Sequence, residues 1–212
     1  SVQEMATLTG VAFDVADKYR TPALILADGA LGQMMEPVDF EVEKKTDLPE
    51  KSWAANGHGG KRKKNIINSL SLNSEQLEQQ NFERFERYKK IEENEVMYEE
   101  FMMEDAEICV VAFGIASRVS KNAIMEARAK GIKVGMIRPI TLWPFPNDIL
   151  KETAKTAKAF LTVEMSKGQM VDDVKLAVEC AKPVHFFGRT GGVIPQPNEV
   201  LEQIRKIAGG IK

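Results

Sequence analysis

The sequence predicts an α/β protein with an open, mostly parallel sheet and helices on both faces. From residue 105 onward, short apolar runs alternate with segments of helical spacing. Because consecutive β–α units join parallel strands through right-handed crossovers, this alternation predicts a parallel sheet covered on both sides. A helix and one apolar run lie far upstream, and a long polar stretch follows them. We therefore expect a partial α/β piece and a long linker helix before this domain.

Residues 1–20 are predicted to form a helix, because Ser1 and Glu4 have the spacing of a capping box and apolar residues recur at helical intervals. Pro22 ends this helix, and the apolar run 23–27 is typical of a strand buried on both faces. One helix and one strand cannot make a sheet, so we expect these first residues to be the end of a larger domain whose beginning is absent. An exposed strand would invite aggregation, so we expect a partner chain, the linker or the missing half to cover it.

The next segment has no sustained period. Pro37, Pro49, the glycine-rich stretch 56–60 and the basic run 61–64 indicate an extended linker. An amphipathic helix is then predicted from residue 73 or 74 to about residue 103. Its apolar face fits either an ordinary core-facing helix or a contact with a partner subunit.

Four β–α units are predicted in the remaining chain. The strands are expected at 108–113, 132–137, 159–164 and 184–187. The helices are expected from about residue 119 up to Gly131, from a cap at Asn147 to about 157, at 170–180, and from about residue 197 or 198 to 208. Gly131 is the expected residue after the first of these helices, where glycine commonly adopts the left-handed conformation.

Composition excludes several classes of protein. The 212 residues are 43% hydrophobic and 28% charged, with a net charge of −2, so no broad basic field for nucleic acid is expected. No apolar run approaches the roughly 20 residues that cross a bilayer, so no membrane is expected. The two cysteines, Cys109 and Cys180, lie far apart, which argues against disulfide scaffolds, structural zinc and iron–sulfur clusters held by this chain alone. A reducing cytoplasm is the default location.

Two glycine-containing loops are candidates for ligand binding. The turn 114–118 follows a strand and opens a helix, where backbone N–H groups can bind a phosphate, although a tight turn alone also explains it. The loop 188–192 lies beyond a strand's carboxyl end, where open α/β sheets place ligands, although its glycines are also explained by positive φ angles. The candidate residues in these loops are Gly114, Ser117, Arg118, Gly191 and Gly192.

Other polar residues favour structural roles. Glu164 ends a strand beside Ser166, Lys167 and Gln169, and without a partner base nearby we expect it to hold a neighbouring loop or subunit rather than to catalyse. His58 and His185 have no second ligand at metal-binding spacing. The basic run 61–64 is interpreted as a solvated face, because no aromatic side chains that could stack on bases lie nearby.

Four motifs carry a resemblance to a known family. They are ALILADGALGQMMEPV at 23–38, IRPITLWPFP at 137–146, VEMSKGQMV at 163–171 and FGRTGG at 187–192. Together they resemble the alpha subunit of 2-oxoacid:ferredoxin oxidoreductases, nearest the 2-oxoisovalerate (branched-chain) type, with the 2-oxoglutarate type close behind. Residues 105–212 also resemble the C-terminal domain of transketolase-type enzymes. By this resemblance, 1–35 is the C-terminal remnant of a pyrimidine-binding domain and 36–104 is the linker.

The resemblance implies part of a thiamine-diphosphate enzyme that converts a 2-oxoacid and coenzyme A to acyl-CoA and CO₂, with electrons passing to ferredoxin. In such a complex, thiamine diphosphate and Mg²⁺ lie between this subunit and a diphosphate-binding subunit, and the iron–sulfur clusters lie on partner subunits. We expect none of these groups on this chain alone.

The family's activating glutamate precedes the first residue, so no catalytic residue is assigned and the isolated chain is expected to be inactive, with a role in assembly. Asp28, Gly29, Gly32 and Gln33 match the loop that borders the cofactor cleft. Two alternatives remain. One is a stand-alone α/β domain that binds coenzyme A or a nucleotide, and the other is a pure subunit-interaction module.

Overall fold

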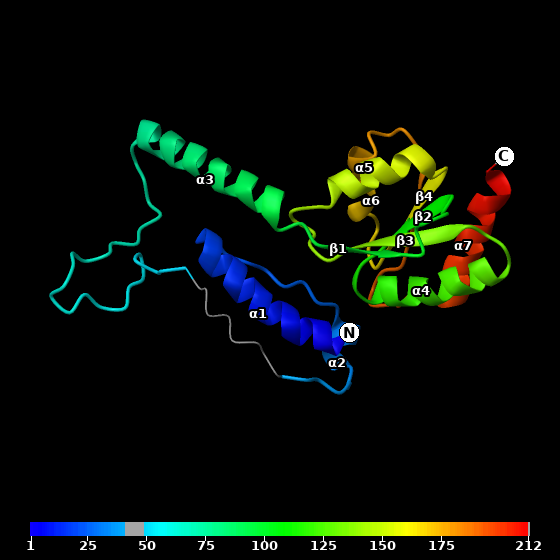
Figure 1. The fold of residues 1–212 in the computed structure, drawn as a ribbon, viewed down its shortest axis with the longest axis horizontal. Coiled ribbons are helices and arrows are strands. Elements are labelled where there is room, and N and C mark those ends of the chain that lie inside the picture. Colours follow the sequence, from blue (N-terminus) through cyan, green and yellow to red (C-terminus); the bar gives the residue numbers. More distant parts are fainter. Residues whose placement is uncertain (41–48, 212) are drawn as a thin grey trace. The chain divides into compact units, whose positions relative to one another are not determined.

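The structure is a computed structural model that describes residues 1–40 and 49–211 (Figure 1). The chain divides into two compact units. The first unit comprises residues 1–26 and 34–91. The second unit comprises residues 27–33 together with the chain from residue 92 onward, and it contains the sheet.

The sheet has five strands in the order β1-β3-β2-β4-β5. The strands are β1 (Tyr98–Phe101), β2 (Ile108–Val111), β3 (Val134–Pro139), β4 (Ala159–Glu164) and β5 (Val184–Gly188). β2 pairs in parallel with β3 and β4, and β4 with β5, whereas β1 runs antiparallel along β3. The predicted open, mostly parallel sheet is therefore confirmed.

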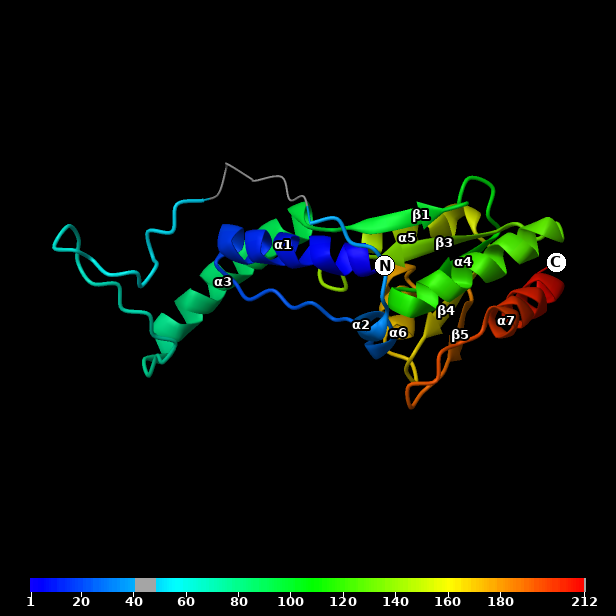
Figure 2. The same ribbon diagram turned by 90° about the horizontal axis from the view of Figure 1, so that it is seen from below.

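Helices cover both faces of this sheet, as the sequence predicts. α4 (Gly114–Ala129) and α7 (Pro197–Gly210) pack in one core cluster, and α5 (Asn147–Thr156) and α6 (Met170–Ala177) pack in the other. Figures 1 and 2 show α4 and α5 on opposite sides of the strands. Along β2, Ile108 and Val110 enter the first cluster and Cys109 and Val111 the second. This alternation explains why the strand is apolar at every position.

The predicted end of the long linker helix is wrong. α3 spans Ser74–Asn94, and the chain then forms β1 instead of continuing as helix to residue 103. The Met97 amide donates to Thr141 Oγ1 at 3.0 Å, and the Met97 carbonyl accepts the amides of Ile140 and Thr141. Because the edge of β3 offers unpaired backbone groups, pairing with that edge replaces the helical hydrogen bonds that residues 98–101 would otherwise make.

In the first unit, α1 spans Val2–Tyr19. The predicted capping box is confirmed, since the Glu4 amide donates to the Ser1 hydroxyl at 3.1 Å and the Ser1 ammonium donates to the Glu4 carboxylate at 2.9 Å. The prediction of a buried strand at 23–27 is wrong. The segment forms no strand, and Leu24 and Leu26 are 81% and 70% exposed. A strand needs a partner for its backbone groups, and the described residues supply none. The covering that we expected is therefore not provided by the described part of the chain.

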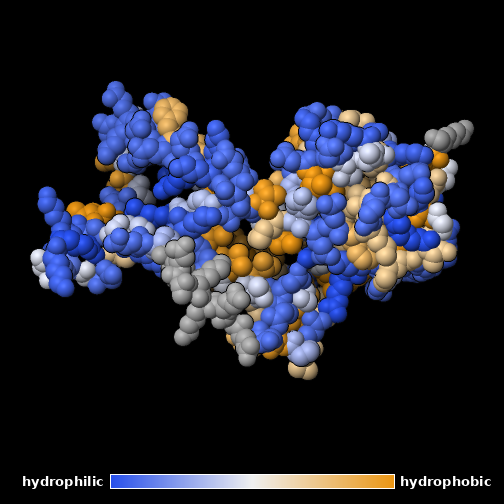
Figure 3. Space-filling view, in the orientation of Figure 1, coloured by the Kyte–Doolittle hydropathy of each residue, from blue (hydrophilic) through white to orange (hydrophobic). Residues whose placement is uncertain are grey.

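Apolar side chains also reach the surface on α3. Phe82 is 59% exposed and Phe85 is 65% exposed, and only Ile91 of this helix is buried. Figure 3 shows hydrophobic residues at the surface among hydrophilic ones. Of the two explanations that the sequence left open, a core-facing helix does not fit the described residues. No described helix is both long enough and apolar enough to cross a bilayer.

Candidate functional site

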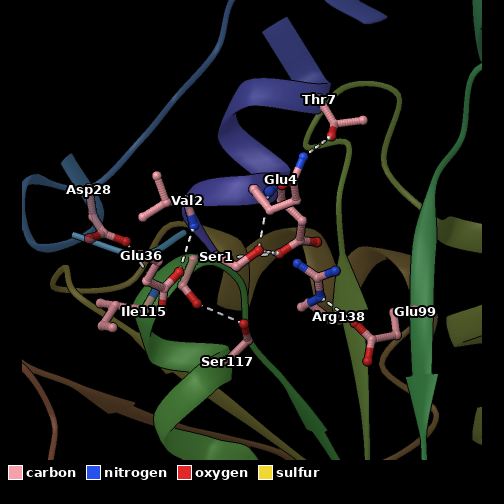
Figure 4. Close-up of polar contacts among 12 residues, drawn as sticks. Ser1, Val2, Glu4, Thr7, Asp28, Glu36, Glu99, Ile115, Ser117 and Arg138 are labelled. Carbon is pink, nitrogen blue, oxygen red and sulfur yellow. Dashed lines mark hydrogen bonds and ion pairs between the residues drawn. The ribbon is translucent and has the colours of Figure 1, made fainter. Parts of the chain in front are cut away.

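Two groups of predicted site residues meet at the N-terminus of α4. The segment 27–33 contains the short helix α2 (Gly29–Gln33), and Asp28 precedes it. Asp28 Oδ1 accepts the Leu31 amide at 2.8 Å. Its Oδ2 accepts the Ile115 amide at 2.9 Å, and Figure 4 shows Asp28 and Ile115. One carboxylate therefore caps α2 and also satisfies a first-turn donor of α4, where the helix dipole favours negative charge.

The start of α4 is shaped to admit this carboxylate. Phe113 occupies the N-cap position and supplies no side-chain hydrogen bond, so the cap comes from Asp28. Gly114 has φ +56°, and a Cβ atom added there would lie 2.9 Å from Asp28 Oδ2. A side chain at residue 114 would therefore be both strained and in contact with the capping oxygen.

The other predicted loop residues lie in different surroundings. Ser117 is buried and its hydroxyl donates to the Gly114 carbonyl at 2.7 Å, whereas Arg118 is exposed. Gly29, Gly32 and Gln33 are exposed on α2. Gly191 and Gly192 have φ angles of +66° and +81° in the loop after β5. Because β4 lies between β2 and β5, one strand separates this loop from the turn that opens α4.

Glu164 forms a second capped helix N-terminus. The residue is 3% exposed at the end of β4. Its Oε1 accepts the Val171 amide at 2.9 Å, and its Oε2 accepts the amides of Gln169 and Met170 at 3.0 and 3.1 Å. The Ser166 hydroxyl donates to Oε2 at 3.0 Å. The expected role in holding the neighbouring loop is therefore confirmed.

The pKa of Asp173 is raised by its surroundings, which include Glu164. Burial raises the pKa of Asp173, and the negative charges of Asp172 and Glu164 raise it further. These three carboxylates stand at or near the first turn of α6. The repulsion at Asp173 is the electrostatic cost of concentrating acidic groups around one helix N-terminus.

A charge cluster that sequence reasoning missed links β1 to β3 and to α4. Arg138 Nε donates to Glu99 Oε2 at 2.7 Å, and Lys121 of α4 bonds to Glu99 Oε1 (Figure 4 shows Glu99 and Arg138). Burial by itself raises the pKa of Glu99, but the Lys121 ammonium and the Arg138 guanidinium outweigh it and hold that pKa below its usual range. The sequence does contain a signal for this cluster, because a charged arginine between Ile137 and Pro139 in an apolar strand needs a partner of opposite charge.

The remaining candidates show no metal chemistry. Within residues 1–40 and 49–211, no group of three or more His, Cys, Asp or Glu side chains could hold a metal ion. His58 Nδ1 accepts the Gly60 amide at 3.1 Å within its own loop. Cys109 is buried, and burial raises the pKa of its thiol to about 12, whereas Cys180 is exposed.

The two carboxylates also limit which ligands the domain can take. α4 and α6 begin at the carboxyl ends of the parallel strands β2 and β4, the edge where α/β sheets usually bind anions. Each helix start is occupied by a carboxylate of the chain itself, Asp28 on α4 and Glu164 on α6. A ligand phosphate at the start of α4 or of α6 would have to displace the carboxylate there.

Comparisons with known proteins agree with this fold. Residues 106–200 match the sequence profile of pyruvate:ferredoxin oxidoreductase core domain II. The solved structure of 2-oxoglutarate:ferredoxin oxidoreductase from Magnetococcus marinus, with 2-oxoglutarate, coenzyme A and succinyl-CoA bound, superposes with a TM-score of 0.69. It covers 94% of this chain and 39% of that chain at 16% sequence identity, so it supports the fold alone.

Relatives found by sequence similarity indicate the type of enzyme subunit more closely than the solved structure does. The ketoisovalerate oxidoreductase subunit VorB of Methanothermobacter marburgensis is 50% identical over 99% of this chain, and that of Methanothermobacter thermautotrophicus is 48% identical over the same share. The 2-oxoglutarate synthase subunit KorA of Methanocaldococcus jannaschii is 31% identical over 94% of this chain. The chain spans about 59% of the length of the VorB relatives and 60% of that KorA relative.

These similarities confirm the resemblance that the motifs indicate, namely a likeness to subunits of 2-oxoacid:ferredoxin oxidoreductases. Within that class, the chain is similar over nearly its whole length to ketoisovalerate oxidoreductase subunits.

Proposed function

We propose that the chain is part of a subunit of a thiamine-diphosphate-dependent 2-oxoacid:ferredoxin oxidoreductase. The reaction converts a 2-oxoacid, with 2-oxoisovalerate as the expected substrate, and coenzyme A to acyl-CoA and CO₂, and it passes electrons to ferredoxin. The observation that carries this proposal is the 50% identity to a ketoisovalerate oxidoreductase subunit across 99% of the chain. The enzyme is placed in the reducing cytoplasm, in keeping with two free cysteines.

The domain division proposed from the sequence belongs to this function. Residues 1–35 are the end of the pyrimidine-binding domain, 36–104 are the linker with its helix, and 105–212 are the transketolase C-terminal-like domain. Gly29, Gly32 and Gln33 are proposed to border the cofactor cleft, and their exposure on α2 leaves them accessible to a neighbouring group.

The described residues do not fit a complete site for thiamine diphosphate and Mg²⁺. They contain no group of three or more metal-ligating side chains, and each oxygen of Asp28 already accepts a backbone N–H bond. When bound, thiamine diphosphate supplies the carbanion stabilisation that the reaction needs. From the resemblance, we propose that the diphosphate, the Mg²⁺ and the iron–sulfur clusters lie on the diphosphate-binding and iron–sulfur subunits, and that this chain serves assembly and the placement of the 28–33 loop.

A pure interaction module is the second candidate. Phe82 and Phe85 are more than half exposed on α3, as a face that packs on another subunit would be. The stand-alone alternative, binding of coenzyme A or a nucleotide at 114–118 and 188–192, is weakened because Asp28 occupies the N-terminus of α4. Gly191 and Gly192 remain its strongest candidates.

Capture of partner subunits tests the proposal. The tagged chain is incubated with native extract, and the eluate is assayed for iron and for viologen reduction with thiamine diphosphate, coenzyme A and either 2-oxoisovalerate or 2-oxoglutarate. Iron in the eluate supports the proposal, and reduction with 2-oxoisovalerate in preference to 2-oxoglutarate supports the substrate. An eluate without iron contradicts the proposal.

A matched pair of variants separates the two candidates. Phe85→Asp charges the exposed face of α3, and Leu176→Asp charges a residue on α6 that is 74% exposed. Loss of iron recovery with Phe85→Asp alone assigns subunit contact to α3. Equal recovery with both variants excludes α3 from the contact. Calorimetric titration of the chain with coenzyme A tests the stand-alone alternative, which an absence of heat at millimolar ligand would eliminate.

A further inference from the structure

The segment 27–33 associates with a part of the chain that is distant in sequence. Residues 1–26 and 34–91 form the first unit, yet the seven residues between them pack with the sheet domain. Leu31 is 8% exposed, which makes it the one buried residue of α2. A short helix of five residues has little stability of its own, so its position depends on what holds it.

Asp28 holds the segment by using both carboxylate oxygens. Oδ1 bonds to the Leu31 amide inside the segment, and Oδ2 bonds to the Ile115 amide on α4. An asparagine has only one acceptor oxygen, and its NH₂ group would face whichever N–H it fails to bind. The connection between the segment and α4 therefore requires a carboxylate and not merely a polar side chain of the same size.

Gly114 is the complementary half of this contact. Its φ is +56°, and a Cβ atom at this residue would stand only 2.9 Å from Asp28 Oδ2. The carboxylate therefore fills the space that a side chain would take. Asp28 and Gly114 thus constrain each other from opposite sides of one contact.

We propose that the N-terminus of α4 recognises the segment 27–33 as an internal anionic ligand, and that Asp28 and Gly114 form a positioning pair that fixes Gly29–Gln33 on the sheet domain. One consequence of this inference rests on the proposed function: in the assembled oxidoreductase, the contact holds the exposed residues of α2 in place. The contact itself is a property of this chain.

Hydrogen exchange of the 212-residue chain tests the contact. In Asp28→Asn and in Gly114→Ala, exchange at the Ile115 and Leu31 amides is expected to accelerate by about tenfold or more, since a hydrogen bond to a charged group is lost. Amides in β2 are expected to be unchanged. Glu164→Gln is the matched control, because it removes the carboxylate cap of α6 and leaves that of α4 intact. Unchanged Ile115 exchange in both Asp28→Asn and Gly114→Ala would overturn the proposal.

A double variant tests the pairing. Once Asp28→Ala has released the segment, adding Gly114→Ala is expected to accelerate Leu31 exchange no further, whereas independent effects would multiply. Multiplying effects would show that the two residues do not act as a pair.

The assembled enzyme supplies the functional readout. Asp28→Asn and Gly114→Ala are expected to lower kcat together, while Glu164→Gln lowers thermal stability with kcat retained at permissive temperature. A wild-type complex without 2-oxoacid-dependent viologen reduction would refute the proposed function and leave the exchange result intact. An active complex in which both variants keep wild-type kcat would refute the positioning role.

Discussion

The Val171 amide donates to Glu164 Oε1 at 2.9 Å, so a nearly fully buried carboxylate stands at the N-terminus of α6. Four donors satisfy this carboxylate, three of them backbone amides of residues 169–171. Burial of a charge is tolerated only with such compensation, and here the helix dipole adds to it.

Glu164→Gln is expected to lower the free energy of unfolding by about 1–3 kcal/mol, because the amide replaces one acceptor oxygen with a donor that faces backbone N–H groups. Urea unfolding monitored by circular dichroism measures the change. Glu202→Gln is the control. Its ion pair with Lys206 is solvent-exposed, so a change below roughly 0.5 kcal/mol is expected. Equal losses in the two variants would contradict the role of Glu164 as a buried cap.

The Glu99 cluster predicts a pH dependence of stability. The pKa of Glu99 is lowered in the folded chain from its ordinary value of 4.5, so its ionised form is favoured by folding. Its stabilising contribution is therefore complete above pH 4.5 and is lost as the pH falls through the lower, folded-state pKa. The difference in unfolding free energy between wild type and Glu99→Gln is expected to be roughly 1 kcal/mol at neutral pH and to shrink in that acidic window.

Urea unfolding across the pH range measures this difference. The partner variant Lys121→Met is its control, since removal of one cation should reduce the effect of Glu99→Gln. A difference that grew on acidification would have the wrong sign for the described ion pairs.

Thiol chemistry should distinguish the two cysteines. Cys109 is fully buried with a pKa raised to about 12, so it holds almost no thiolate near neutral pH, whereas Cys180 is exposed. A disulfide reagent is expected to modify one thiol in the native chain and two after unfolding in guanidinium. Cys180→Ser should remove the native reaction, and rapid native modification in that variant would show that Cys109 is accessible.

Two leucines with opposite surroundings test the packing of the sheet domain. Leu150 of α5 is fully buried, and Leu176 of α6 is 74% exposed. Leu150→Ala is expected to lower the unfolding free energy by about 2–5 kcal/mol, and Leu176→Ala to change it by less than about 0.5 kcal/mol. Similar losses at the two positions would mean that α6 is covered by something in solution.

Much of the sheet domain follows from sequence alone. β4 begins and ends where predicted, at Ala159 and Glu164, and α6 begins at its predicted first residue, Met170. α7 begins at Pro197, one of its two predicted starts, whereas Asn147, the predicted cap of α5, is its first helical residue. These elements are readable because a strand buried on both faces is a continuous apolar run, and because proline and glycine interrupt the chain between elements. The same local rules predicted the Ser1 cap, the glycine after α4 and the structural role of Glu164.

Local rules fail where a distant segment decides the outcome. Residues 98–101 have a helical pattern but pair with β3, and the apolar run 23–27 has a strand pattern but finds no partner among the described residues. Strand formation depends on a neighbour's backbone groups, which spacing along one segment does not contain.

The sequence by itself determined the α/β class, the order of its repeating units and its relationship to 2-oxoacid oxidoreductases, because periodicity and motifs are local in the chain. Only the tertiary structure decided that Asp28 caps α4. Asp28 and Ile115 are 87 residues apart, and the 2.9 Å hydrogen bond between them exists because the fold brings the second oxygen of the Asp28 carboxylate to a helix start that has no side-chain cap of its own.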